Sequence, residues 1–213
     1  MMLTSIIIIS FLFSCATTQQ KQSESKDANF YNSRGVDYGE KGQYDQAIAD
    51  YNKAIEIDPK FGKAYNNRGI AYANKGQYGY AIADYNKALD LDPKFATAYY
   101  NRGCAYGEKG LYEQEIADYN QAIEINPKDA MAYNNRGYAY GKKRQYDQAI
   151  ANYNKAIEMA PEYAKAYSNR AIAYYFKKEY DKSWEDVRKA KNLGYQIPIK
   201  FLDDLRKASG KQN

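Results

Sequence analysis

The apolar positions from residue 28 onward follow a helical period that is interrupted at regular intervals. In one segment Tyr99, Gly103 and Tyr106 fall at positions i, i+4 and i+7, which lie on one face of an α-helix. Gly110 follows, and a glycine placed there favours the end of a helix. A second kind of segment, at residues 81–89, has apolar residues at i, i+1, i+4, i+7 and i+8 and ends at an Asp-Pro pair. Since proline disfavours helical geometry in the residue before it, the pattern predicts pairs of helices separated by short turns.

This pair of segments recurs along most of the chain with a period of 34 residues. A proline marks the period in four copies, at Pro59, Pro93, Pro127 and Pro161. A fixed period of this length is typical of a solenoid, in which each repeat packs against its neighbours. We therefore expect an all-α protein with five copies, at residues 28–61, 62–95, 96–129, 130–163 and, in degenerate form, 164–197.

Several recurring positions resemble those of the tetratricopeptide repeat family. In the second copy these positions are Tyr65, Gly69, Tyr72, Ala81, Tyr85, Ala88 and Pro93. The resemblance implies a right-handed α-solenoid of helix-turn-helix repeats, in which the first helix of each repeat lines a concave groove. It also implies that Gly69 is small so that the paired helices can approach closely, with Ala81 opposite.

Both ends of the array differ from its interior, as the polar terminal faces of a solenoid require. In the first copy Asp37 replaces an alanine that recurs in every later copy. At the other end, residues 198–213 open with Pro198 and carry apolar residues on one helical face. These residues are Phe201, Leu202, Leu205 and Ala208. We expect this segment to be a helix that caps the fifth repeat.

The first residues differ from the repeats because Leu3 to Phe13 is an apolar stretch without charge. It is too short to span a bilayer, which needs about 20 residues, and it fits the hydrophobic region of a secretory signal. The residues LFSC at 12–15 resemble the lipobox of bacterial lipoproteins. The resemblance implies a signal peptide at residues 1–14, a lipid on Cys15 and a flexible tether over residues 15–27.

A lipid on Cys15 would anchor the protein to a membrane of the bacterial cell envelope, at the outer membrane if the host has one, in a periplasmic or surface-exposed position. Three other interpretations of the same residues stay open. The small residues around Cys15 are an ordinary cleavage site, or the apolar stretch is an uncleaved anchor. In the third, the start is misassigned and the protein is a soluble intracellular adaptor.

Composition favours a folded chain without catalytic chemistry. Apolar residues make up 45% and charged residues 27%, so the 213 residues can bury a core. There is no histidine, which excludes Ser-His-Asp and Cys-His catalysis and any His-ligated metal. The two cysteines, Cys15 and Cys104, cannot form a four-cysteine metal site. We expect no catalytic residue, no metal and no cofactor.

The net charge of +5 is uneven, because the excess of basic residues lies in residues 164–213. A solvated polar face is the ordinary explanation for such an excess. The alternative is an anionic surface bound through Lys177, Lys178 and Arg188, with binding that depends steeply on salt. We expect no nucleic acid partner.

The family resemblance places asparagines on the concave face, at Asn67, Asn101, Asn135 and Asn169. A side-chain amide both donates and accepts hydrogen bonds, so a ladder of amides can hold a peptide backbone without reading its sequence. The same face is expected to carry Ile70, Tyr100, Tyr138 and Ile172. The predicted partner is a peptide or helix of another protein. The alternative is that the asparagines only bridge neighbouring helices.

Two further sets of residues have structural explanations. The recurring arginines Arg68, Arg102 and Arg170 are each placed to reach an aspartate of the partner helix, namely Asp84, Asp118 and Asp186. In the fourth copy, Asn152 takes the place of the aspartate opposite Arg136. Cys104 is expected to be a half-buried thiol.

One residue conflicts with this plan. Glu115 occupies a position at which other copies have Ala47, Ala81 and Ala149. A carboxylate at a close helix contact must reach solvent or be costly to bury. We therefore expect Glu115→Ala to raise the melting temperature.

Overall fold

The computed structural model describes residues 27–211. Within this range its eleven helices are α2 (Ala28–Glu40), α3 (Tyr44–Ile57), α4 (Gly62–Asn74), α5 (Tyr78–Leu91), α6 (Ala96–Glu108), α7 (Tyr112–Ile125), α8 (Ala130–Lys142), α9 (Tyr146–Met159), α10 (Ala164–Phe176), α11 (Tyr180–Asn192) and α12 (Ile199–Ser209). The all-α class is confirmed. None of these helices is both long enough and apolar enough to cross a membrane. The expected signal peptide, the lipidated Cys15 and the tether up to residue 26 lie outside the described residues.

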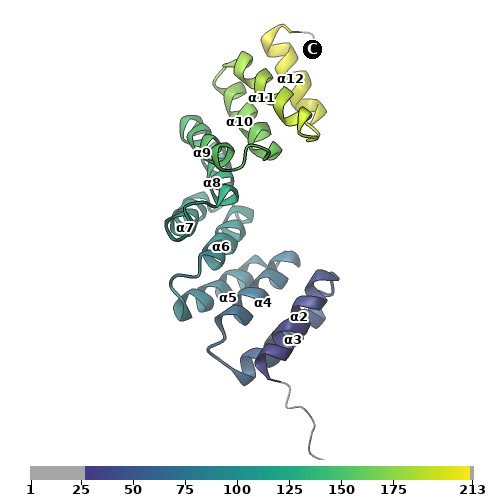
Figure 1. Cartoon of the computed structure of the whole chain (residues 1–213), viewed down its shortest axis with the longest axis vertical. Helices are drawn as coiled ribbons and strands as arrows, with labels where there is room; N and C mark the ends of the chain where they lie inside the picture. The colour runs from purple at the N-terminus through teal and green to yellow at the C-terminus, as the bar shows by residue number, and fades with distance from the viewer. Residues whose placement is uncertain (1–26, 212–213) are drawn as a thin grey trace, which may run out of the picture.

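The helices form an elongated stack of pairs, with α2 near one end and α12 at the other (Figure 1). Each pair falls within one 34-residue copy, and the helices of a pair make the most extensive contacts in the molecule. The first helices of adjacent pairs also contact one another, from α2 with α4 through to α8 with α10. Comparable contacts between successive second helices are absent from residues 27–211. The first helices therefore lie closer together and form the inner side of the array.

The turn inside each pair has a similar left-handed residue in every repeat. Gly42, Gly76 and Gly110 have φ values of 71°, 72° and 72°, a conformation that glycine adopts at little cost. Arg144 and Lys178 take the same place in the fourth and fifth repeats, with φ values of 60° and 62°. Because these two residues keep the turn without being glycine, packing of the flanking helices determines its geometry.

A tyrosine of the second helix packs against a glycine of the first helix in each of the first four repeats. Tyr85 is 1% exposed, and a Cβ placed on Gly69 would lie 2.6 Å from its ring. The tyrosine ring thus adds to the close helix approach expected at Gly69. In the fourth repeat the alanine opposite is also close, since a Cβ on Gly137 would lie 3.1 Å from the Ala149 carbonyl oxygen. In the fifth repeat Ala171 and Val187 replace the glycine and the tyrosine, and both are buried. The smaller valine leaves room for the added methyl group, which keeps the interior close-packed.

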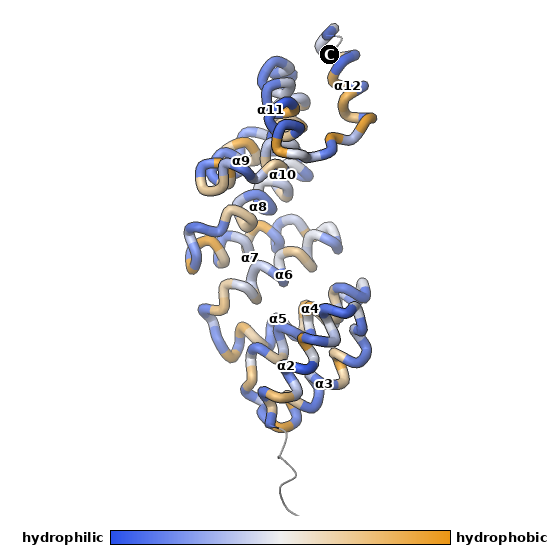
Figure 2. The backbone as a smooth tube through the Cα atoms, turned by 45° about the vertical axis from the view of Figure 1, so that its right-hand side comes forward, coloured by the Kyte–Doolittle hydropathy of each residue, from blue (hydrophilic) through white to orange (hydrophobic). Residues whose placement is uncertain are grey.

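The C-terminal end holds a larger apolar cluster than the earlier repeats. Trp184, Leu202 and Leu205 are buried together where α12 covers the fifth repeat. The final helix is thus a cap, although Ala208, expected on its buried face, is exposed. At the other end Asp37 is exposed, as expected of a terminal repeat. Figure 2 shows apolar and polar positions alternating along the helices of the whole array.

Candidate functional site

Two hollows lie next to each other on the first helices of the C-terminal half of the array. One, of about 540 Å³, is formed mainly by α8, α9 and α10 and includes Ile172 and Phe176. The other, of about 600 Å³, is formed mainly by α6, α7 and α8. Tyr138, Lys142 and Asn169 line both hollows, so they form one continuous depression. We call this depression the groove.

Apolar side chains continue this surface towards the N-terminal repeats. Ile70 is 37% exposed and Tyr138 is 47% exposed, and they occupy equivalent positions of α4 and α8. Val36 is exposed at the same position of α2, while Ile172 of α10 is half-buried. An apolar line along the inner helices is a surface on which a partner can bury its own apolar side chains. The structure therefore places Ile70, Tyr138 and Ile172 at equivalent positions of the inner helices.

The predicted asparagines connect successive repeats through their amide groups. In three cases Nδ2 donates to an asparagine of the preceding repeat, and two of them are Asn101 to Asn66 Oδ1 and Asn169 to Asn134 Oδ1, each at 3.0 Å. Asn67 donates in the same way to Asn32 Oδ1 at 3.0 Å. The alternative of amides that bridge neighbouring helices thus describes these contacts. Asn67, Asn101 and Asn169 each still have a second N–H available for other partners. Asn135 differs, because its Nδ2 also contacts Cys104 Sγ at 4.0 Å.

The third repeat interrupts this ladder with a tyrosine. Tyr100 accepts a hydrogen bond from Asn135 Nδ2 at 2.9 Å through its hydroxyl oxygen. Its ring lies 5.7 Å from the ring of Tyr119. Burial raises the pKa of Tyr100 above its ordinary value. Tyr100 therefore supports the wall of the groove through Asn135 and Tyr119, which line it.

Sequence reasoning missed the acceptors of this ladder. Asn32, Asn66 and Asn134 each precede the predicted groove asparagine, or its counterpart Ser33, by one residue. Asn66 and Asn134 are buried at 3% and 0% exposure. Their own period of 34 residues was the available signal, because a polar residue that recurs on the buried side of a helix needs a recurring partner.

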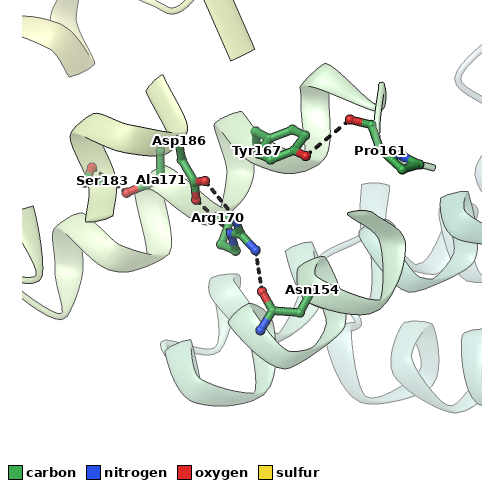
Figure 3. Close-up of polar contacts among 7 residues, drawn as sticks. All are labelled: Asn154, Pro161, Tyr167, Arg170, Ala171, Ser183 and Asp186. Carbon is green, nitrogen blue, oxygen red and sulfur yellow. Dashed lines mark hydrogen bonds and ion pairs between the residues drawn. The ribbon is translucent and has the colours of Figure 1, made fainter. Parts of the chain in front are cut away.

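The recurring arginines bind the partner helix and the preceding repeat at the same time. Figure 3 shows Arg170 between Asp186 and Asn154. Arg170 Nε and Nη2 donate to the two carboxylate oxygens of Asp186, both at 2.7 Å, and Nη1 donates to Asn154 Oδ1 at 2.6 Å. Arg68 and Arg102 make the equivalent bidentate contacts with Asp84 and Asp118. The predicted ion pairs are confirmed, and they tie three helices together.

The fourth repeat has a weaker version of this arrangement. Arg136 Nε donates to Asn152 Oδ1 at 2.7 Å, and its Nη1 donates to Asn120 Oδ1 at 2.6 Å. Asn152 supplies no negative charge, so burial lowers the pKa of Arg136. By contrast, the hydrogen bond to Asp118 raises the pKa of Arg102. These arginines are structural residues rather than candidates for phosphate binding or catalysis.

Glu115 is the most unusual polar group of the groove. It is 4% exposed, and its Oε2 atom has no hydrogen-bond partner. Burial raises the pKa of its carboxyl from 4.5 to about 7, although a hydrogen bond with Tyr119 acts in the opposite direction. The carboxylate occupies space left by a glycine, because a Cβ on Gly107 would lie 2.8 Å from it. Glu115 therefore stays inside the repeat instead of reaching solvent.

Cys104 lies beside Glu115 in the same hollow. It is half-buried, as expected, and its Sγ lies 3.2 Å from the hydroxyl oxygen of Tyr119. Burial raises the pKa of the thiol, which disfavours the reactive thiolate. Within residues 27–211, no cluster of three or more acidic, cysteine or histidine residues is arranged to hold a metal ion.

Comparisons with known proteins agree with this architecture. Residues 35–76, 71–110 and 106–143 match the family model described as TPR repeat, and residues 130–163 match the model described as tetratricopeptide repeat. A comparison with curated proteins returned no match.

Solved structures with the same arrangement of helices include a crystal structure of MamA. It is 30% identical, with a TM-score of 0.70 over 75% of this chain and 94% of that chain. PilF of Pseudomonas aeruginosa is 22% identical, with a TM-score of 0.74 over 86% of this chain and 87% of that chain, a likeness that shows the fold alone. The first TPR domain of Spaghetti (RPAP3), solved with the HSP90 peptide SRMEEVD, is 29% identical, with a TM-score of 0.54 over 55% of this chain and 94% of that chain.

The family matches together extend over more than half of the chain, and MamA is covered almost completely at 30% identity. The helix pairs, the 34-residue period and the groove on the first helices all belong to the same plan. The chain is a member of the tetratricopeptide repeat family, whose proteins are non-catalytic scaffolds for protein–protein interaction.

Proposed function

We propose that the groove holds an extended peptide or a helix of a partner protein. The observation that carries this proposal is the apolar line on the inner helices, which leads into the depression shared by Tyr138 and Asn169. Ile70, Ile172 and Tyr100 extend the contact surface along the array. The remaining N–H groups of Asn67, Asn101 and Asn169, and a remaining lone pair of the Asn135 amide oxygen, provide hydrogen bonds for a peptide backbone.

The RPAP3 domain supports the proposal, since that relative was solved with a peptide from HSP90. That peptide, SRMEEVD, carries three acidic residues. In the present groove the buried carboxylate of Glu115 would repel such residues. We therefore propose a partner segment of a different charge pattern.

A crosslinking experiment tests the groove. A photoreactive phenylalanine analogue replaces Tyr138, and the matched control places it at Ile199, which is 76% exposed on α12 outside the groove. We expect one protein partner to be crosslinked from position 138 and not from position 199, and Ile172→Ser to reduce the yield. Equal crosslinking from both positions, or none from position 138, would contradict the proposal.

We also propose that the scaffold is a lipoprotein of the bacterial envelope, anchored through Cys15. The apolar stretch followed by LFSC supports this proposal. The test is the intact N-terminal mass of the protein purified from its native membrane fraction. A chain that begins at an acylated Cys15 is the expected result. A chain that begins at Met1 without lipid would favour an intracellular adaptor or an uncleaved anchor.

The alternative of an anionic surface bound through the fifth repeat gains little support. Lys177 Nζ lies 2.6 Å from Asp147 and 2.8 Å from Glu179, so its charge is balanced within the protein. Lys178 and Arg188 are left to attract such a surface. Binding through two exposed charges would be weak at physiological salt.

A further inference from the structure

One hollow of the groove contains a buried carboxylate that the protein leaves incompletely satisfied. Glu115 is 4% exposed, and its Oε2 atom has no hydrogen-bond partner. Buried polar atoms are normally paired, so an orphaned carboxylate oxygen requires an explanation. The other copies avoid the problem with Ala47, Ala81 and Ala149, and the fifth repeat has Ser183. The carboxylate is thus a local feature and not part of the repeat plan.

The carboxylate lies at the wall of a space that can admit a ligand. The hollow of about 600 Å³ is lined by Glu115, Cys104, Asn135 and Tyr138, among others. Asn135 and Tyr138 belong to the predicted peptide-binding residues, so the carboxylate and the peptide surface share one depression. A bound segment could therefore place one side chain against Glu115 while its backbone lies along α8.

The protein does not supply its own counter-ion at this point. Lys142 and Lys165 both line the hollow, but within residues 27–211 neither forms an ion pair with Glu115. The Nζ atom of Lys142 lies 5.0 Å from the centre of the Tyr138 ring. Glu108 also lines the hollow and adds negative charge. The hydrogen bond with Tyr119 is the one contact that favours the ionised carboxylate besides the distant attraction of Lys142. A cation in direct contact with the carboxylate is what the site lacks.

The first helix makes room for the carboxylate in this repeat. A Cβ on Gly107 would lie 2.8 Å from three atoms of the Glu115 carboxylate, whereas a Cβ on the equivalent Gly141 would have only an ordinary contact, at 3.8 Å from Tyr153. Gly107 thus gives the carboxylate its place at the edge of the hollow. The position of the carboxylate is defined by packing, which a recognition group requires.

We propose that this hollow receives the ammonium or guanidinium group of a lysine or arginine side chain of the partner segment, with Glu115 as its buried counter-ion. The inference rests on the proposed function of the groove and specifies the chemistry of its ligand. A charge-assisted hydrogen bond from that group would give the Glu115 carboxylate the partner it lacks. The amides of Asn135 and Asn169 would hold the backbone on either side of this side chain.

The test uses pools of short acetylated and amidated peptides that are random except for one fixed central residue. The fixed residue is lysine, arginine or norleucine, which has the length of lysine without its charge. The full chain is immobilised as wild type, as Glu115→Gln and as Glu124→Gln. Glu124 is an exposed carboxylate of the same helix that lies outside the groove, so it is the matched control.

We expect the wild-type protein to retain the lysine and arginine pools at least about tenfold better than the norleucine pool, as for hydrogen bonds to charged groups. This preference should disappear in Glu115→Gln and persist in Glu124→Gln. Retention of the norleucine pool by Glu115→Gln shows that this variant is folded. Equal retention of the three pools by the wild type, or an unchanged preference in Glu115→Gln, overturns the inference.

The same experiment separates this inference from the proposed function. If the norleucine pool binds and no preference for a cationic residue exists, the groove stands and the inference fails. If the wild type retains no pool, the groove proposal fails and the inference fails with it. Free butylammonium provides a further arm. If it shifts the carboxyl resonance of Glu115 while the pools show no preference, the hollow binds small amines and not the side chain of a partner, which also overturns the inference.

Discussion

The third and fourth repeats have the same backbone plan and different chemistry. Both consist of a helix of 13 residues followed by a helix of 14 residues. Within the second helix, Glu115 of the third repeat corresponds to Ala149 of the fourth, and Asp118 corresponds to Asn152. Two changes thus give the third repeat two more negative charges at buried positions.

These two charges have opposite consequences. Asp118 is paired with Arg102 by two hydrogen bonds of 2.7 Å and 2.8 Å. Glu115, one helical turn away, has an oxygen with no partner. The comparison shows that the repeat frame tolerates a buried charge in either situation, since the helices are unchanged. It also indicates that Asp118 stabilises the helix pair through Arg102, whereas the Glu115 carboxylate is available to bind a ligand.

The largest expected effect comes from removing the paired charge. Asp118→Ala should lower the free energy of unfolding by about 3 kcal/mol, because it leaves the Arg102 guanidinium without its bidentate partner. The matched change Asn152→Ala should lower it by about 1 kcal/mol, the value of an ordinary hydrogen bond. Urea unfolding followed by circular dichroism measures both. Equal losses in the two variants would mean that the aspartate and the asparagine are interchangeable here.

The second prediction concerns the unpaired charge. Glu115→Ala should raise the free energy of unfolding by about 1–2 kcal/mol at pH 8, because it removes a buried group that lacks a partner. The melting temperature should rise by roughly 2–4 °C for each kcal/mol. A fall in melting temperature at pH 8 would contradict the prediction.

The stabilisation of the protein by Glu115→Ala should depend on pH. The carboxyl of Glu115 has a pKa of about 7 in the folded protein against an ordinary value of 4.5. The folded state therefore holds the proton more tightly than the unfolded state, and this residue destabilises the wild type as the pH rises from about 5 to above 7. We expect Glu115→Ala to have little effect at pH 5 and its full effect at pH 8. Thermal melts of both proteins across this range test the sign.

The third prediction concerns the space beside the carboxylate. Gly107→Ala should lower the free energy of unfolding by about 1 kcal/mol more than Gly141→Ala does, because the Cβ at position 107 would lie 2.8 Å from Glu115. Gly141→Ala meets only an ordinary contact at 3.8 Å, and alanine favours a helix, so this variant should be neutral or stabilising. In the Glu115→Ala background the penalty of Gly107→Ala should vanish. A penalty that persists there would place its origin elsewhere.

The smallest expected effect comes from converting the fourth repeat to the third. Asn152→Asp restores a negative charge opposite Arg136 and should stabilise the protein by roughly 0.5–1 kcal/mol, as for partly exposed ion pairs. The gain is limited because Asn152 Nδ2 donates to the Gln148 carbonyl oxygen at 2.7 Å, and an aspartate cannot make that bond. Chemical denaturation at low and high salt checks the prediction. A gain that is insensitive to salt would argue against an electrostatic origin.

The repeat architecture was readable from the sequence because its signals are local and recur. The 34-residue period predicted the helix pairs. The separation of 16 residues between Arg68 and Asp84 predicted that both side chains lie where the two helices of one pair meet. A contact within a repeat depends on the geometry of one helix-turn-helix unit, which the pattern determines. Arginine pairing was therefore predictable before any coordinates.

Contacts between repeats were harder to predict. The acceptors Asn32 and Asn134 lie on the preceding repeat, so identifying them requires the stacking of one helix on the next. The role of Gly107 depends on where the Glu115 carboxylate points, and a side chain of that length has several options. The exposure of Ala208 follows from the angle at which α12 crosses the fifth repeat. The period marks Asn32 and Asn134 as candidates without giving their partners, and the relations of Gly107 and Ala208 follow no period.

The apolar cluster around Trp184 and α12 has a consequence for how the array is made. Translation proceeds from the N-terminus, so the first four repeats are complete before the ribosome reaches this cluster. Until then the newest repeat ends in an open face, since each repeat of a solenoid needs a neighbour. A product that stops before Pro198 would keep that face available to other chains and would be prone to associate. The largest apolar cluster of residues 27–211 therefore forms only after the first four repeats are made, and α12 then covers the open face of the fifth.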